Sequence, residues 1–274
     1  MSNRQGVRAG LLLTPPMLWL GVAYLGALAA LFITAFWGQN DFTGKVEHEF
    51  TLDNFRDLFT VPVYRTITIR TLLIAVFVTA VDAVLAFPIA LYMAKFASPR
   101  VRRLLVIAVL MPLWASYLVK AYSWRAMLSA SGPLAWLGWT PGYGKVGLIL
   151  TLAYMWLPYM VLPIYAGLER LPNALVEASA DLGASAAHTL RRVVVPMAFP
   201  AIVAGSIFTF SLTMGDYIAV QIVGGPYQLL GNVVYDNIGA ANNLPFAAAY
   251  ATVPVVVMLG YLALVKRTGA LENL

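Results

Sequence analysis

Two acidic residues, Asp82 and Asp216, lie inside long stretches of apolar sequence. A charged side chain in hydrocarbon costs about 2.5–3.5 kcal/mol on insertion scales, so acidic residues in a membrane span are few and often functional. Asp216 follows Gly215, which permits a local break in a helix, and Tyr217 and Gln221 follow it one helical turn apart. These residues predict a polar place on a translocation pathway, with Asp82 as a second candidate.

Both acidic residues have an alternative role. The Asp216 carboxylate could instead hydrogen-bond a helix break or a neighbouring span, and the sequence does not decide between this role and a substrate contact. For Asp82, a pair with a basic residue elsewhere in the helix bundle is favoured over a place on the pathway.

Four aromatic residues gather near the end of the third apolar stretch: Trp114, Tyr117, Tyr122 and Trp124. Such clusters are typical of a membrane–water interface, so anchoring is favoured over substrate stacking, for which Trp114 is the candidate. Lys120 and Arg125 are close by in the sequence. They would repel a cationic substrate, or would contact an acidic binding protein.

Other residue types argue against catalysis and metal binding. His48 and His188 stand alone with no second ligand at a useful spacing, and the chain has no cysteine. The sequence contains no Gly-x-x-x-x-Gly-Lys-Ser/Thr loop to hold phosphates, so the chain is not expected to hydrolyse ATP. We therefore predict no metal, no cofactor and no enzyme activity on this chain.

The composition is that of a membrane protein. The chain is 61% hydrophobic and 11% charged, whereas soluble domains carry about 25% charged residues. The apolar stretches are long enough for helices that cross a bilayer, and they lack the polar–apolar alternation of barrel strands. The net charge of +6 is explained by basic cytoplasmic loops, without a role for nucleic acid. An all-α membrane protein is expected.

The apolar stretches predict six transmembrane helices in a single domain over residues 1–274. Their approximate bounds are 11–36, 66–93, 104–122, 146–168, 199–223 and 246–265. The first stretch is too long for a signal peptide and lacks a clear cleavage site, so it is expected to remain as a span.

Charged residues predict the topology, because basic loops stay in the cytoplasm. The cytoplasmic set, which includes residues near both termini, is Arg4, Arg8, Lys95, Arg100, Arg102, Arg103, Arg170, Arg191, Arg192, Lys266 and Arg267. The loop after the first span is acidic and is expected outside, with Asp41, Glu47, Glu49, Asp53 and Asp57. Lys120, Arg125 and Lys145 run against this pattern.

Two connections between spans are predicted to be folded. Residues 51–60 have the spacing of a short helix on the outer surface. Residues 169–198 predict a helix–turn–helix, with Asn173 as the first N-cap, Gly183 at the turn, Ser185 as the second N-cap and Pro196 as a kink or restart. Three small residues, Ala178, Ser179 and Ala180, would be exposed for docking. The alternative is an amphipathic connector that rests on lipid headgroups.

The 169–198 loop resembles the EAA loop of ABC importer permeases, which reads Glu-Ala-Ala, three residues, Gly, nine residues, Ile-x-Leu-Pro. Here Glu177-Ala178-Ser179, Gly183 and Val193-Val194-Val195-Pro196 keep every interval. The resemblance implies a type I importer fold with both termini in the cytoplasm. It also implies that this loop is the coupling helix that docks on a cytoplasmic ATPase. The residues assigned to coupling are Glu177, Ala178, Ser179, Asp181, Gly183 and Pro196.

The likeness extends from about Thr71 to Leu264 and is greatest to spermidine/putrescine-type permeases. It implies a bacterial inner-membrane protein that works with a second permease, an ATPase dimer carrying ATP and Mg²⁺, and a periplasmic binding protein. A polyamine would suit acidic and aromatic pathway residues through ion pairing and cation–π contact. Importers of an amino-acid derivative or an organophosphonate remain alternatives within the family, and an autonomous secondary transporter or channel remains one outside it.

Overall fold

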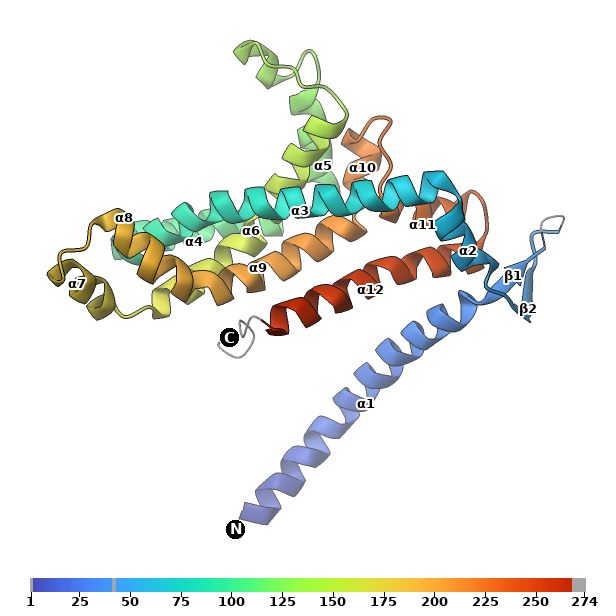
Figure 1. Ribbon diagram of the computed structural model, residues 1–274, viewed down its shortest axis with the longest axis horizontal. Helices are drawn as coiled ribbons and strands as arrows, with labels where there is room; N and C mark the ends of the chain where they lie inside the picture. The colour runs from blue at the N-terminus through green and yellow to red at the C-terminus, as the bar shows by residue number, and fades with distance from the viewer. Residues whose placement is uncertain (1, 41–42, 268–274) are drawn as a thin grey trace. The chain divides into compact units, whose positions relative to one another are not determined.

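The computed structural model describes residues 2–40 and 43–267, most of them in helices (Figure 1). The long helices are α1 (Ser2–Thr34), α3 (Pro62–Leu91), α6 (Lys145–Arg170), α9 (Val195–Gly215) and α12 (Leu244–Arg267). The shorter α-helices are α2 (Asp53–Thr60), α4 (Pro99–Trp114), α5 (Tyr117–Leu128), α7 (Asn173–Asp181), α8 (Ala186–Thr189), α10 (Ile218–Val223) and α11 (Leu230–Gly239). Two π-helical turns, η1 (Tyr92–Phe96) and η3 (Leu190–Val194), and one 3₁₀ turn, η2 (Pro133–Leu137), complete the helical elements. Asp41 lies outside the described residues.

The helical membrane fold is confirmed. Among the described residues, five helical stretches are long and apolar enough to cross a membrane: Leu12–Thr34, Pro62–Phe96, Lys145–Arg170, Ala186–Gly215 and Leu244–Arg267. A sixth span results if Pro99–Trp114 and Tyr117–Trp136 are counted together, although the chain bends by 96° between them. Four of the predicted spans, 11–36, 66–93, 146–168 and 246–265, therefore have continuous helical counterparts.

The third predicted span, 104–122, is wrong as a single helix. Helix α4 ends at Trp114, Ala115 takes an extended backbone conformation (φ −71°, ψ 140°), and α5 begins at Tyr117. Pro112 lies inside α4 and does not end it. Apolar sequence continues through this break, so hydropathy alone gives no sign of it.

The fifth predicted span, 199–223, is also wrong at its second half. Helix α9 stops at Gly215, the residue that permits a local break in the helix, and Asp216 has an extended backbone (φ −72°, ψ 126°). The remaining residues form the separate short helix α10. At the other end, the helical stretch begins much earlier than predicted, at Ala186.

The chain divides into two compact units. One contains residues up to Arg65 together with Val233–Val253, and the other contains Thr66–Asn232 together with residues from Pro254 onward. The single-domain assignment over 1–274 stays a prediction.

The first unit contains a feature that the all-α expectation missed. Strands β1 (Trp37–Gln39) and β2 (Val46–Phe50) pair as an antiparallel hairpin. A helix is confirmed within residues 51–60 as α2, and Asn54 from it donates to the carbonyls of Ala35 (3.0 Å) and Trp37 (2.8 Å). These bonds join α2 to the end of α1 and the start of the hairpin.

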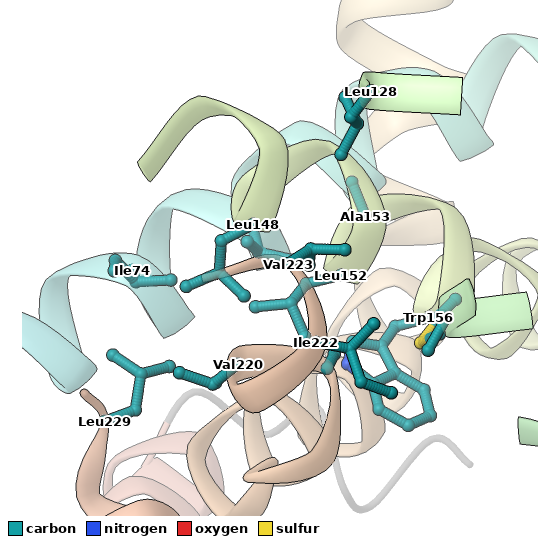
Figure 2. Close-up of a cluster of buried hydrophobic side chains, with 14 residues drawn as sticks. Ile74, Leu128, Leu148, Leu152, Ala153, Trp156, Val220, Ile222, Val223 and Leu229 are labelled. Carbon is teal, nitrogen blue, oxygen red and sulfur yellow. The ribbon is translucent and has the colours of Figure 1, made fainter. Parts of the chain in front are cut away.

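The second unit is built around α6. In Figure 2, side chains from α3, α5, α6 and α10 meet in one apolar cluster, in which Ile74, Leu148, Leu152 and Val223 are almost fully buried. Helix α9 packs along α6, because small residues let the two backbones approach (Figure 1). A Cβ at Gly205 would lie only 3.1 Å from the Cα of Met160.

This close approach predicts that Gly205→Ala destabilises the bundle. An added methyl group must push α9 from α6, and overpacking of this kind costs about 1–3 kcal/mol. The matched control is Gly260→Ala in α12, because nothing lies within 4 Å of a Cβ at that position. Thermal unfolding in detergent should show a lower Tm for the Gly205 variant only. An equal Tm for both variants would contradict the packing described above.

Candidate functional site

The two broken helices meet at Asp216. The Tyr117 hydroxyl, at the first position of α5, donates a hydrogen bond to the Asp216 Oδ2 atom. The backbone N–H of Ala219 in α10 donates to Oδ1 at 2.9 Å. Asp216 is 7% exposed, so both bonds form away from water. The carboxylate therefore joins the break of one span to the break of the other.

The backbone at the second break is also held in place. The Tyr217 carbonyl accepts from Gln221 N at 3.0 Å and from the Asn232 side chain at 3.1 Å. Buried backbone groups need such partners, because an unpaired one costs about as much as a lost hydrogen bond. Asn232, which sequence reasoning missed, is 3% exposed and supports the break from α11.

Arg125 stabilises the far end of α10. Its Nη1 atom donates to the Ile222 carbonyl at 2.8 Å, and its guanidinium carbon lies 4.9 Å from the centre of the Tyr143 ring. The last carbonyls of a helix have no partner within the helix, so a cation there is favourable. Arg125 thus holds the end of α10, and its repulsion of a cationic substrate stays a prediction.

A pocket of about 270 Å³ opens beside the break. Tyr117, Trp156, Gly215, Asp216 and Tyr217 contribute to its wall. The ring centres of Tyr117 and Trp156 are 6.1 Å apart. When ionised, a carboxylate has about four lone-pair sites, so an ionised Asp216 retains acceptor capacity beyond its bonds to Tyr117 and Ala219. The pocket thus combines one acidic group with aromatic walls.

Two of the predicted pathway residues, Asp216 and Tyr217, line this pocket, and three do not. Gln221 is exposed on α10, one turn beyond Tyr217 as expected. Trp114 is 79% exposed at the end of α4. Asp82 is fully buried on α3, and within the described part of the chain neither of its oxygens has a hydrogen-bond partner. The prediction that Asp82 pairs with a basic residue is therefore wrong within residues 2–40 and 43–267.

Among the pocket residues that sequence reasoning missed are two aromatic ones, Tyr117 and Trp156. Tyr117 was assigned to an interfacial belt, and its contact with a residue 99 positions away has no local signal. Trp156 lies well inside the fourth span, whereas belt tryptophans lie at span ends. That position could have identified Trp156 as a pathway candidate.

The 169–198 loop forms the predicted pair of helices, α7 and α8. Gly183 has φ +79°, in the left-handed region that favours glycine, and it closes α7 as expected. Ser185 caps α8 by accepting from His188 N at 3.4 Å. Glu177, Ala178 and Asp181 are exposed. This surface is open to a partner.

Three details of the loop differ from expectation. Asn173 is the first residue of α7 and Pro172 is the N-cap, while the Asn173 side chain accepts from Lys95 Nζ at 2.9 Å. The Ser179 hydroxyl is half-buried against that of Thr189 at 2.9 Å, so it ties α7 to α8 and offers little docking surface. Pro196 begins no separate helix, because it lies in the first turn of α9 and the helical stretch Ala186–Gly215 runs through it.

Known proteins resemble this chain over most of its length. The sequence model of the family described as "Binding-protein-dependent transport system inner membrane component" matches residues 86–268, a range that includes the loop and Asp216. The chain is 45% identical over 292 residues to the inner membrane ABC transporter permease protein YdcU of Escherichia coli (strain K12), covering 99% of this chain and 93% of that protein.

Two further relatives are informative. The spermidine/putrescine transport system permease protein PotB of Escherichia coli (strain K12) is 32% identical over 246 residues, covering 85% of this chain and 86% of that protein. A chain of the bacterial alginate ABC transporter, solved with an alginate pentasaccharide-bound periplasmic protein, superposes with a TM-score of 0.72. It shares 15% identity and covers 99% of this chain and 96% of its own, so it supports the fold.

Proposed function

Because this chain belongs to the family of binding-protein-dependent transport system inner membrane components, we propose that its coupling loop drives import of a polyamine-like cation when a partner ATPase hydrolyses ATP. The chain is a multi-pass permease of the bacterial inner membrane and an ABC importer subunit. The proposal adds the substrate class, the residues that act, and the pairing with a second permease.

The observation that carries the coupling role is the exposed α7–Gly183–α8 turn. Glu177 and Ala178 are exposed, and Leu182 at the turn is 89% exposed. An apolar side chain left this open at a loop tip suits burial in the groove of a partner protein. Two copies of a cytoplasmic ATPase, with ATP and Mg²⁺ bound to them, are the proposed partner, and this chain hydrolyses no ATP itself.

The proposed substrate class is based on the pocket beside Asp216. A carboxylate with spare acceptor capacity would receive an ammonium group, and the Tyr117 and Trp156 rings would offer cation–π contact. PotB, which resembles this chain over most of its length, is named for spermidine and putrescine. The second permease would contribute the other half of the pathway, and a periplasmic binding protein would deliver the solute.

This function can be tested by measuring the uptake of radiolabelled spermidine into proteoliposomes that contain the assembled transporter in a known orientation. Uptake should require ATP, the binding protein and all subunits, and a non-hydrolysable ATP analogue should abolish it. Uptake by this chain alone without nucleotide would instead identify a secondary transporter. ATP hydrolysis stimulated by the binding protein, with no spermidine uptake, would reject the polyamine and retain the importer.

A further inference from the structure

A single cation holds the joint between α6 and the coupling loop. Lys95 Nζ donates to the Leu171 carbonyl at 2.6 Å and to Asn173 Oδ1 at 2.9 Å. Leu171 is the C-cap of α6 and Asn173 is the first residue of α7, so the two acceptors lie on either side of Pro172. Both bonds are charge-assisted, which makes them stronger than bonds between neutral groups.

Lys95 itself belongs to another span. It lies in the π-helical turn η1, which continues α3 at its cytoplasmic end. π-Helical turns are rare in proteins, and those that do occur often lie at functional sites. The sequence explained Lys95 only as one of many basic residues that set the topology. That role requires no particular partner, whereas the structure gives the ammonium group two specific ones.

A second cation stabilises the turn that carries Lys95. Arg102 from α4 donates to the carbonyls of Met93 (3.0 Å) and Ala94 (3.2 Å) in η1. It also lies 3.6 Å from Glu169 in the last turn of α6. Arg102 thus holds the turn at the end of α3 from which Lys95 contacts the loop.

The loop is directly continuous along the chain with α6 and with α9, and it is not continuous with α3. The Ser179–Thr189 bond passes any movement of α7 to α8, which is continuous with α9. Helix α3 receives that movement through apolar contacts, which can slide, and through Lys95. Among the hydrogen bonds of the described residues, the two made by Lys95 are the ones that join α3 and its π turn to 171–198.

We propose that Lys95 is a positioning residue of energy coupling, which locks the α6–α7 joint to the end of α3 so that displacement of the coupling loop also moves α3. The inference rests on the proposed function of the loop. A purely structural role would affect assembly and ATP hydrolysis as much as transport. A positioning role instead separates transport from hydrolysis.

The test uses Lys95→Met in the complete transporter, with spermidine uptake and ATP hydrolysis measured on the same proteoliposomes. We expect uptake per ATP hydrolysed to fall about tenfold, a change in the range produced by mutations that alter coupling between sites. Lys95→Arg, which keeps the charge and donors, should recover most of the ratio. Arg103→Met is the matched control, because Arg103 bonds only to Pro99 of its own helix among the described contacts.

A distance measurement gives a second readout. The chain has no native cysteine, so spin labels at Phe96→Cys and Ala174→Cys are the only ones on this chain once the partner subunits are made cysteine-free; both native side chains are exposed. The inter-label distance should stay narrow with and without trapped ATP in the wild-type background and should broaden in Lys95→Met.

An unchanged ratio and distance in Lys95→Met would overturn the inference, as would a parallel loss of uptake and hydrolysis. Absence of ATP-dependent uptake in the wild-type protein would instead overturn the proposed function, and this inference with it. The wild-type measurement alone reveals that case.

Discussion

Gly183→Pro is expected to abolish most ATP-dependent uptake while leaving the membrane bundle folded. Gly183 has φ +79°, and the proline ring holds φ near −65°, so the turn between α7 and α8 cannot form. The exposed tip would then no longer fit the proposed docking groove on a partner ATPase. A loss of about 3 kcal/mol in docking corresponds to roughly a hundredfold loss of productive complex.

Gly183→Ala is the graded control for this prediction. Alanine can adopt a left-handed conformation at a cost of about 1–2 kcal/mol, so the turn is weakened and still forms. No neighbouring atom lies within 4 Å of a Cβ at this position, which excludes a steric effect. Uptake should therefore fall in the order wild type, alanine, proline, and copurification of the ATPase should fall in parallel. Wild-type uptake by Gly183→Pro would disprove the coupling role.

Glu177→Lys tests the same surface without changing the backbone. The side chain is exposed, so reversing its charge should leave the Tm unchanged. It should lower copurification of the ATPase and ATP-dependent uptake, because a charge that is complementary to a partner becomes repulsive. A variant that binds the ATPase and transports normally would show that Glu177 lies outside the docking surface.

Sequence reasoning succeeded where the structural signal is local. The Gly183 turn and the Ser185 cap are each specified by residues within a few positions of the feature, and the structure contains both. The long helices also follow from local apolar composition, because a span needs little more than length and hydrophobicity. The β-hairpin had a weaker local signal, since only the first and last residues of Val46–Phe50 are apolar and the three between them are polar.

The failures share a cause, which is partnership between distant residues. The break at Ala115 and Ser116 falls within apolar sequence that gives no sign of it. The break places Tyr117 against Asp216. The Asn173 side chain was free to cap a helix in sequence terms, but Lys95, 78 positions away, binds it instead. Neither contact has a period or spacing that can be read from the chain.

The Tyr117–Asp216 pair also permits the sharpest test of the pathway. Tyr117→Phe removes the donor to Oδ2 and leaves a buried acceptor without that partner, which costs about 1–3 kcal/mol. Asp216→Asn removes the charge but keeps an oxygen for the Ala219 N–H. Both variants should lower the Tm, and their effects on stability should be coupled, because contacting residues usually share about 0.5–3 kcal/mol of interaction energy.

Transport separates the structural role of Asp216 from a substrate contact. If Asp216 only holds the two breaks together, Tyr117→Phe and Asp216→Asn should lower uptake to a similar extent, and the double variant should add little. If the carboxylate also binds an ammonium group, Asp216→Asn should lower spermidine uptake by a further factor of about thirty or more in the Tyr117→Phe background, since truncating a buried charged contact costs about 2–5 kcal/mol. We expect the second result. Measuring the initial uptake rate and the Tm for all four proteins decides between the two, because the substrate contact affects the rate without a matching change in Tm.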